Sequence, residues 1–256
     1  MDVSIAIIGH KHLKYLPDLF ASIYRTSIKR TTQIVFVDNN SCDGSVEFVK
    51  KNYPDVKVIQ NKEAYNFAKN NNIAFKGSSG DFFLMLNPDT EIREGSIDKM
   101  VDFLEQSTDA GACGPKLIFP DGNIQLSCRR FPTLRSFLFR RTPLRYLFQD
   151  SMRDKIHLMT DFGHDETTQV DWLLGACIMV RRSVYEELGG MDELFEMYCE
   201  DIDFCKRLNK KGYKVYYYPE AEIIHHHLAE TDKTFFTKKT WLHLKSMVHY
   251  LTKHWI

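Results

Sequence analysis

The order of apolar and polar residues along the first hundred positions predicts alternating strands and helices. Short runs rich in valine, isoleucine and phenylalanine alternate with stretches in which apolar residues recur every three or four positions. This alternation is typical of an α/β protein with a mainly parallel central sheet and helices on both faces. The predicted strands span residues 3–8, 33–37, 56–59 and 81–86, and the predicted helices span residues 13–24, 46–51 and 67–75.

The second half of the chain is less regular at first. Residues 118–168 contain turn signals but no clear βα repeat, and we interpret them as an insertion packed on the sheet. Further elements are predicted as strands over 170–180 and 213–218, helices beginning near Ser183 and Asp201, and an amphipathic helix over 234–255. We expect one domain over residues 1–232, with halves at about 1–117 and 118–232, and a separate basic amphipathic helix over 233–256.

Length and composition indicate a globular protein. The chain has 256 residues, of which 43% are hydrophobic, so it can bury a substantial core. Its 34 Lys and Arg balance 34 Asp and Glu, which gives no overall field to attract nucleic acid. Its six cysteines never form C-x-x-C, and its apolar runs fall short of the ~20 residues of a membrane span. Without an apparent secretory signal, we expect a cytoplasmic protein that does not span a membrane.

An acidic turn follows the fourth predicted strand. Ligands of open α/β sheets bind beyond the carboxyl ends of the strands, and Asn87-Pro88-Asp89 stands at such an end. A carboxylate there suits a Mg²⁺ ion held between protein oxygen and a diphosphate. The alternative is an ordinary β-turn, which the same tripeptide favours.

A second acidic pair, Glu200-Asp201, begins a predicted helix. Acidic residues in a first turn often serve only to stabilise the helix dipole. The functional alternative is that one carboxylate faces a pocket and accepts a proton from an attacking hydroxyl.

Two further strand ends carry candidate ligands. His225-His226-His227 follows the last predicted strand, and a neutral imidazole can bind a metal, although surface histidine clusters are often inert. We conjecture that Asp89 and His225 bind one ion. Asp38 ends the second strand, where it could contact a nucleobase or sugar, but the single Gly9 after the first strand argues against a dinucleotide site.

Two basic stretches offset the neutral total. Six arginines and no acid lie between Arg129 and Arg145, interleaved with apolar residues, and five lysines and no acid lie between Lys233 and Ile256. The second stretch carries an apolar stripe of Trp241, Leu244, Met247 or Val248, Leu251 and Trp255. Such a helix can lie on an anionic membrane or dock on the core of the protein. We favour membrane contact because both stretches lack acids. Nucleic acid could bind the same charges, but no recognisable nucleic-acid motif accompanies them.

Seven segments, taken in order, resemble the motif blocks of family 2 glycosyltransferases. They lie at residues 3–8, 37–45, 86–90, 114–117, 175–177, 189–193 and 198–203, and the resemblance runs from residue 3 to about 231. Residues 120–125 and 129–133 resemble the middle segment of the rhamnosyltransferase-like branch.

The resemblance implies a GT-A-type fold and an inverting transfer of a sugar, with rhamnose suggested by the branch, from a nucleoside diphosphate sugar to a hydroxyl. It implies that Asp201 is the catalytic base and that Asp89 and His225 bind Mg²⁺ or Mn²⁺. The residues assigned to the nucleotide sugar are Gly9, Asp38, Asn40, Lys69 and Asn87, and those assigned to the acceptor or sugar pocket are Trp172, Gly175, Ala176 and Glu200.

The implied role is cell-surface glycan synthesis on a lipid-linked or polysaccharide acceptor, at the inner face of the plasma membrane. Some segments depart from the family pattern. Its Thr-Tyr-Asn is Gly9-His10-Lys11 here, its Asn-x-Gly is Ala64-Tyr65-Asn66, and Leu228 and Glu230 replace a glycine and a serine. The alternatives are a non-catalytic nucleotide-sugar-binding or scaffold protein of the same fold, and a nucleotidyltransferase, for which no glycine-rich phosphate loop is visible.

Overall fold

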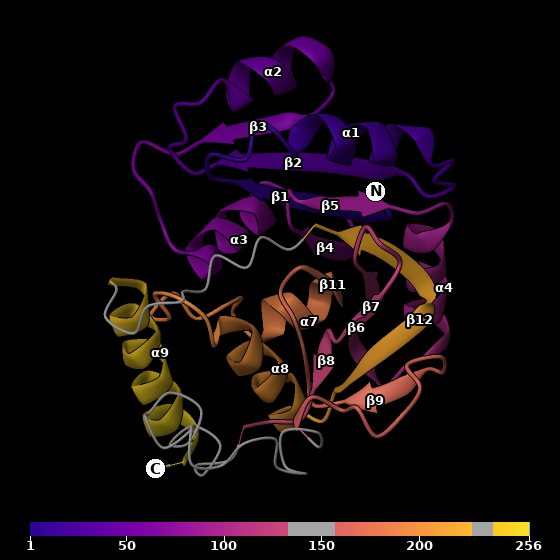
Figure 1. Cartoon of the computed structure of the whole chain (residues 1–256), viewed down its shortest axis with the longest axis vertical. Helices are drawn as coiled ribbons and strands as arrows, with labels where there is room; N and C mark the ends of the chain where they lie inside the picture. The colour runs from indigo at the N-terminus through magenta and orange to yellow at the C-terminus, as the bar shows by residue number, and fades with distance from the viewer. Residues whose placement is uncertain (133–156, 227–237, 256) are drawn as a thin grey trace.

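Four parallel strands form the amino-terminal half of a central sheet (Figure 1). The computed structural model describes residues 1–132, 157–226 and 238–255. Each of the four predicted strands is present, with its ends shifted by one residue at most. They are β1 (Val3–Gly9), β2 (Thr32–Asp38), β3 (Lys57–Gln60) and β4 (Phe82–Leu86), in the spatial order β3-β2-β1-β4.

The rest of the sheet is mixed. Strand β11 (Cys177–Arg181) runs antiparallel between β4 and β6 (Ala110–Ile118), and β12 (Lys214–His225) lies parallel to β6. The edge strand β5 (Thr90–Ile92) pairs antiparallel with β12. Short strands complete the structure: β7 (Ile124–Gln125) on β6, β9 (Thr168–Val170) on β12, and a separate pair of β8 (Cys128–Arg129) with β10 (Trp172–Leu173).

Two predictions of strand extent are wrong. The single strand predicted over 170–180 is divided into three: β9 pairs with β12, β10 with β8, and β11 with β4 and β6. The strand predicted to end at Tyr218 continues to His225. Its pairing with β6 shifts register between Tyr218 and Glu222, around Pro219, which has no N–H to donate to the ladder. The irregularity therefore bends the strand without ending it.

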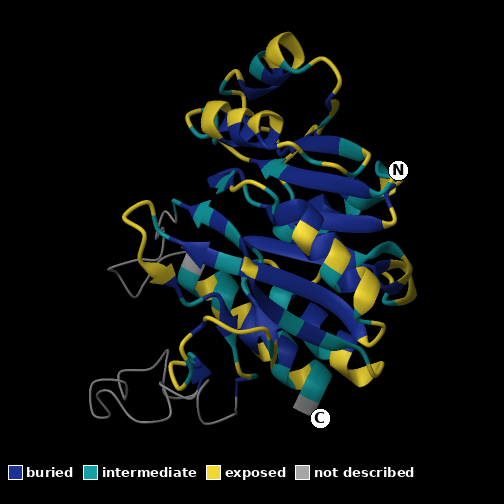
Figure 2. Ribbon diagram, turned by 90° about the vertical axis from the view of Figure 1, so that its right-hand side faces the viewer, coloured by how far each residue is buried: buried dark blue, intermediate teal, exposed yellow. Residues whose placement is uncertain are grey.

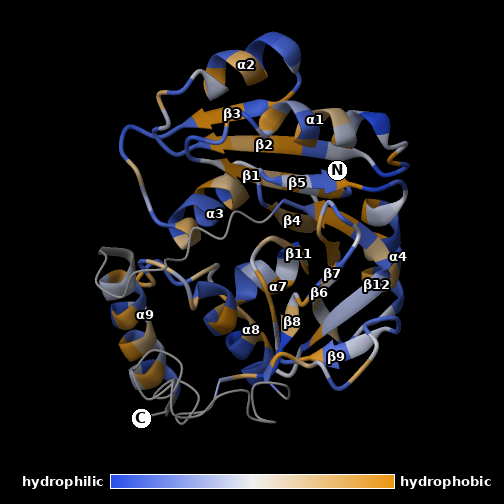
Figure 3. Cartoon of the chain, in the orientation of Figure 1, coloured by the Kyte–Doolittle hydropathy of each residue, from blue (hydrophilic) through white to orange (hydrophobic). Residues whose placement is uncertain are grey.

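Helices cover both faces of the sheet and enclose two hydrophobic cores. Ile5 and Ile7 of β1 belong to one core, and Ala6 between them belongs to the other, as expected from the alternation of a strand. Figure 2 shows that the middle of the sheet is mostly buried, and Figure 3 shows hydrophobic residues along β1, β2 and β4. The first core includes residues of α1 (Leu16–Arg25), α2 (Ser45–Asn52) and α4 (Ser96–Gln106), and the second those of α3 (Phe67–Lys76), α7 (Arg182–Glu187) and α8 (Glu200–Lys210).

The last helix, α9 (Lys238–Trp255), packs beside α8 (Figure 1). Met247 and Tyr250 are buried in the core, whereas Trp241, Leu244 and Val248 are 68%, 43% and 53% exposed. The apolar stripe predicted from the sequence is thus divided between a docked face and an exposed face. In the described part of the chain, no helix combines the length and the apolar character that crossing a bilayer requires.

Candidate active site

The carboxyl ends of β1, β2 and β4 meet at one edge of the sheet. Gly9 pairs with Asp38, and Ile7 pairs with Leu86, directly before Asn87-Pro88-Asp89. Because β11 runs in the opposite direction, its amino end lies at this edge too, and the Ala176 carbonyl accepts a hydrogen bond from the Asn87 N–H at 2.9 Å. Loops from both halves of the chain therefore converge here.

Asp89 and His225 lie in direct contact, as the sequence suggested. The His225 Nε2 atom is 3.4 Å from the Asp89 Oδ1 atom, and the residues are 4% and 9% exposed. The end of β12 is fixed to the acidic turn by a 2.9 Å hydrogen bond from the His226 N–H to the Asp89 carbonyl. Two ligands of one Mg²⁺ or Mn²⁺ ion, each about 2.1 Å from it, lie within ~4.2 Å of each other. The 3.4 Å between His225 Nε2 and Asp89 Oδ1 satisfies that condition.

Gln125 orients the His225 ring. The Gln125 Oε1 atom can only accept a hydrogen bond, so the His225 Nδ1 atom, 2.7 Å away, carries the proton. This leaves His225 Nε2 directed at Asp89, which is the arrangement that metal-binding histidines use. Sequence reasoning missed Gln125, which lies in the two-residue strand β7 and is 100 positions from its partner.

The electrostatics of Asp89 also suit a cation. Burial acts to raise the pKa of this carboxyl, but the contact with His225 and the charge of the nearby His12 outweigh burial and hold the pKa below its ordinary value. Among the described residues, no cluster of three or more His, Cys, Asp or Glu could hold an ion. Asp89 and His225 alone would fit a magnesium-type site whose other ligands come from substrate phosphate and water.

Asp38 and Gly9 form the neighbouring part of the edge. Asp38 is 1% exposed; its Oδ2 atom accepts from the Ser41 N–H at 3.2 Å, whereas Oδ1 has no hydrogen-bond partner among the described residues. A buried carboxylate oxygen without a partner is costly, and a ligand N–H or O–H would satisfy it. Asp38 also lines a hollow of about 400 Å³ with Gly44 and Gln60. A Cβ atom on Gly9 would lie 2.8 Å from the Phe36 ring, so the close packing of β1 on β2 requires glycine.

The other residues assigned to the nucleotide sugar have varied environments. Lys69 lies in the first turn of α3, with its Nζ atom 3.6 Å from the centre of the Tyr65 ring. Asn40 is exposed and has a left-handed backbone, with φ of 55°. Asn87 is partly buried and begins the acidic turn. The structure brings Asn87 next to Asp89 and gives no direct contact that joins Lys69 to either.

Glu200 and Asp201 occupy the first turn of α8. The Asp201 Oδ2 atom accepts from the Gly175 N–H at 3.2 Å, and Oδ1 accepts from the Ile202 N–H at 2.9 Å. Burial raises the pKa of Asp201 to about 6, opposed by these N–H groups and by Arg129. Burial, together with the adjacent Asp201, raises the pKa of Glu200 further. Because the pKa of Glu200 is raised more than that of Asp201, Asp201 is the member of the pair that loses its proton first as the pH rises.

The residues assigned to the acceptor pocket divide into two groups. Gly175 and Ala176 lie between the acidic turn and Asp201, and Glu200 adjoins Asp201. Trp172 differs: it is 6% exposed and donates its indole N–H to the Arg130 carbonyl at 3.0 Å, so it packs β10 into the core. Its assignment to the pocket stays a prediction.

Two histidines near the acidic turn were not assigned from the sequence. His12 in the loop after β1 acts electrostatically on Asp89, and His226 lies 2.7 Å from Glu91 through its Nε2 atom. Tyr15 lies between them, with ring centres 6.2 Å from His12 and 6.1 Å from His226. The only sequence signal was their position after strand ends.

Comparison with known protein families assigns the chain. The model of the family described as "Glycosyl transferase family 2" matches residues 4–189, which is more than half of the sequence. The chain belongs to glycosyltransferase family 2. The family predicted from the ordered motifs is therefore confirmed, and the match includes Asp38, Asn87, Asp89 and Gly175.

The curated relatives of this family 2 chain include rhamnosyltransferases. It is 30% identical over 233 residues to the N-acetylglucosaminyl-diphospho-decaprenol L-rhamnosyltransferase of Mycobacterium tuberculosis, covering 84% of this chain and 73% of the relative. It is 28% identical to rhamnosyltransferase WbbL of Escherichia coli K12 over 263 residues, covering 98% and 93%. These relatives confirm the rhamnosyltransferase-like branch.

A solved structure confirms the GT-A type of fold. The crystal structure of GalNAc-T7 with UDP, GalNAc and Mn²⁺ superposes with a TM-score of 0.66 at 18% identity, over 88% of this chain. This family 2 chain spans 44% of the length of that protein, so the likeness concerns the fold alone.

Proposed function

We propose that this family 2 glycosyltransferase transfers a sugar, rhamnose by its relatives, from a nucleoside diphosphate sugar to a hydroxyl group with inversion. The observation that carries the proposal is that the Asp89–His225 pair and the Asp201 carboxylate are held on either side of the Gly175-Ala176 backbone. The two groups are linked by the Asn87 N–H to Ala176 carbonyl bond and the Gly175 N–H to Asp201 bond.

In this proposal, Asp201 is the base. Its ionised carboxylate removes the proton of the acceptor hydroxyl as the hydroxyl oxygen attacks the anomeric carbon and the bond to the diphosphate breaks. General-base assistance is worth about 10²–10⁴ in rate, and it is most effective when the pKa of the base lies near the working pH. The raised pKa of Asp201 supports this role. The pKa of the adjacent Glu200 is raised further, so Glu200 gives up its proton less readily than Asp201 does.

Asp89 and His225 would hold Mg²⁺ or Mn²⁺ at the diphosphate. When bound, such an ion supplies Lewis-acid stabilisation of the negative charge on the leaving group. The Asp38 carboxylate would accept a hydrogen bond from the nucleoside, which would satisfy its Oδ1 atom. The solved structure of GalNAc-T7 contains Mn²⁺ together with UDP, which supports a divalent metal in this fold.

The relatives suggest the acceptor. The name of the mycobacterial relative specifies an N-acetylglucosaminyl-diphospho-lipid that receives L-rhamnose, and we propose an acceptor of that class here. A panel of UDP-, GDP- and dTDP-linked sugars, tested by thermal shift with Mn²⁺, would identify the donor, because a ligand that binds only the folded state raises the melting point.

The test of the function is transfer by the wild type and by Asp201→Asn. We expect this substitution to lower kcat by about 10²–10⁴ and to leave donor affinity within about twofold, because the amide keeps the shape of the side chain but cannot accept the proton. Near-normal kcat in Asp201→Asn would contradict the base assignment. Tight donor binding by a wild type that transfers nothing would favour the scaffold alternative.

We also propose that the exposed face of α9 contacts an anionic membrane on the cytoplasmic side. Trp241, Leu244 and Val248 occupy positions i, i+3 and i+7 of a helix in a segment without acidic residues. The arginine-rich stretch that supported this prediction lies mostly in residues 133–156, outside the described residues. Because α9 also has a buried face, substitution tests the contact better than deletion does. Trp241→Ser with Val248→Ser should release the protein from vesicles containing phosphatidylglycerol, and retained binding would contradict the proposal.

A further inference from the structure

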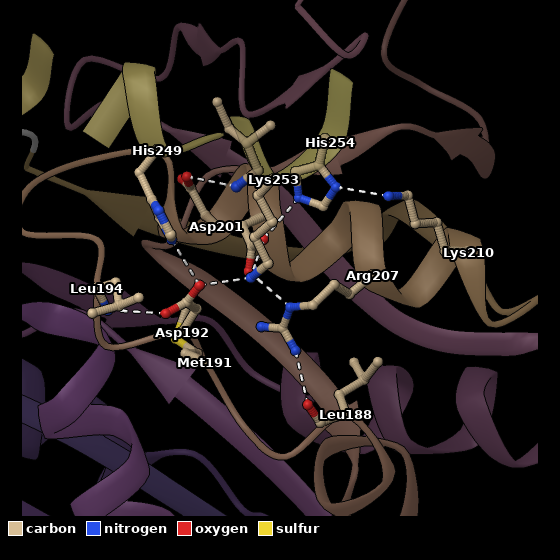
Figure 4. Close-up of polar contacts among 12 residues, drawn as sticks. Leu188, Met191, Asp192, Leu194, Asp201, Arg207, Lys210, His249, Lys253 and His254 are labelled. Carbon is tan, nitrogen blue, oxygen red and sulfur yellow. Dashed lines mark hydrogen bonds and ion pairs between the residues drawn. The ribbon is translucent and has the colours of Figure 1, made fainter. Parts of the chain in front are cut away.

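Helix α9 contacts the chain on both sides of Asp201. It packs against the loop that precedes α8 and against the first turns of α8 itself (Figure 4). The proposed reaction assigns no role to this helix, and the family match ends at residue 189, before α8 begins.

The contact with the preceding loop falls on strained backbone. Tyr198 and Cys199, directly before Glu200, are both left-handed, with φ of 60° and 69°. Such a conformation costs about 1–3 kcal/mol per non-glycine residue and persists only where the surroundings impose it. From α9, the buried Ser246 hydroxyl accepts the Met197 N–H at 3.2 Å, and the His243 ring lies 4.9 Å from the Tyr198 ring.

The contact with α8 falls on Asp203, which is fully buried two residues after Asp201. Its Oδ2 atom accepts from Arg207 Nε at 2.8 Å, and its Oδ1 atom receives Lys253 Nζ and His254 Nε2 from α9, each at 2.8 Å. A buried carboxylate that loses its partners is strongly destabilised, so the position of Asp203 depends on α9.

The partners of Asp203 are themselves fixed. The Lys210 ammonium group is 3.0 Å from His254 Nδ1 and can only donate, so the proton of the neutral His254 ring is on Nε2 and points at Asp203. Lys253 Nζ also lies 2.6 Å from Asp192 Oδ2, which His249 of α9 approaches at 3.0 Å (Figure 4). Helix α9 thus joins the loop at 192, the strained turn at 197–199 and the first turns of α8.

We infer that α9 positions the catalytic turn: Ser246 and Lys253 are positioning residues that hold Met197 and Asp203, and through them Asp201, in the geometry for proton transfer. The inference rests on the proposed function. It assigns α9 a part in sugar transfer that is independent of its proposed contact with the membrane, because the residues involved are on its docked face.

The experiment uses the full chain with Ser246→Ala and Lys253→Met, each assayed in detergent without membranes. Matched controls make the same substitutions at the amino ends of strands, far from Asp201. Ser4→Ala removes a buried hydroxyl that accepts the Gly80 N–H at 2.8 Å, and Lys214→Met removes a lysine that pairs with Asp109 at 2.7 Å. The readouts are kcat and donor KM, the pH dependence of kcat, and hydrogen–deuterium exchange of peptides covering 196–204.

We expect both test variants to lower kcat by about tenfold, as for one unsatisfied buried polar group, with donor KM within about twofold. Exchange at 196–204 should increase while exchange at 82–90 is unchanged. A loosened turn admits water to Asp201 and so lowers its pKa, because burial is what raises that pKa. The acidic limb of the profile of kcat against pH should therefore move to lower pH. Lys253→Arg, which keeps the charge, should restore kcat at least in part, and the controls should leave kcat within about twofold.

Unchanged exchange at 196–204 would overturn the inference, as would increased exchange with unchanged kcat, or an equal loss of kcat in Ser4→Ala. Exchange does not depend on turnover. A wild type that transfers no sugar is therefore a failure of the proposed function, whereas unchanged exchange in an active enzyme is a failure of the inference about α9.

Discussion

The hydrogen bond between Gln125 and His225 provides a sharp test of the proposed metal site. Replacing Gln125 by Met removes the acceptor for the Nδ1 proton and keeps the length of the side chain. In the variant, a proton on Nδ1 has no acceptor. The ring is therefore more stable with the proton on Nε2, which faces the Asp89 carboxylate. A metal ion needs Nε2 without a proton, so binding must reverse this shift.

The size of the effect follows from burial. Gln125 and His225 are 5% and 4% exposed, so water cannot easily replace the lost acceptor. Leaving a buried donor unsatisfied costs about 1–3 kcal/mol, which is roughly 5- to 150-fold in an equilibrium constant. Residues that orient metal-bound histidines typically contribute 10- to 100-fold to metal affinity. We therefore expect the dissociation constant for Mn²⁺ to rise by about 10- to 100-fold.

The assay is a Mn²⁺ titration in the presence of nucleoside diphosphate, with free Mn²⁺ measured by electron paramagnetic resonance. Gln125→Glu keeps an acceptor and should bind Mn²⁺ at least as tightly as the wild type does. Gln33→Met is a matched control, because Gln33 accepts from Ser4 and Ser79 at the opposite end of the sheet. Wild-type Mn²⁺ affinity in Gln125→Met would refute the reasoning, provided that its melting point without metal is normal.

Two further predictions concern pH and packing. Burial raises the pKa of Asp201 to about 6, and a base must be ionised to accept a proton. The value of kcat, measured from pH 4.5 to 8, should therefore fall about tenfold per pH unit below that pKa. A kcat that stays constant down to about pH 4.5 would contradict the assignment. Gly9→Ala would place its Cβ atom 2.8 Å from the Phe36 ring, so calorimetry should show a loss of about 1–3 kcal/mol of stability, and an unchanged melting point would mean that β1 and β2 separate easily at this edge.

The amino-terminal half of the fold follows closely from the sequence. Its strands are apolar runs that end in polar clusters, so both their extent and the placing of Asp38 and Asn87-Pro88-Asp89 at one edge of the sheet could be predicted. Helix α4 was overlooked although its signal is regular: Ile97, Met100, Val101 and Leu104 have helical spacing and are buried.

The second half could be predicted less well because its interactions are not local. Strand β12 passes Pro219 through an irregularity that depends on β6, which no local pattern reveals. The role of Gln125 depends on a partner 100 residues away. In α9, apolar residues lie on more than one face of the helix. Met247 and Val248 are adjacent in the sequence, so their spacing could not show that Met247 is buried and Val248 is exposed.

The reversed direction of β11 has a geometric consequence for any reaction at this edge. On one side of the dipeptide Gly175-Ala176, the Ala176 carbonyl fixes the turn that carries Asp89; on the other, the Gly175 amide fixes the carboxylate of Asp201. If Asp89 and Asp201 have the proposed roles, covalent main-chain dimensions therefore set the separation between the leaving-group end and the attacking end of the substrate. On that proposal, a side-chain exchange at 175 or 176 would alter which sugar fits between them, whereas an insertion or deletion of a residue there would change the separation itself.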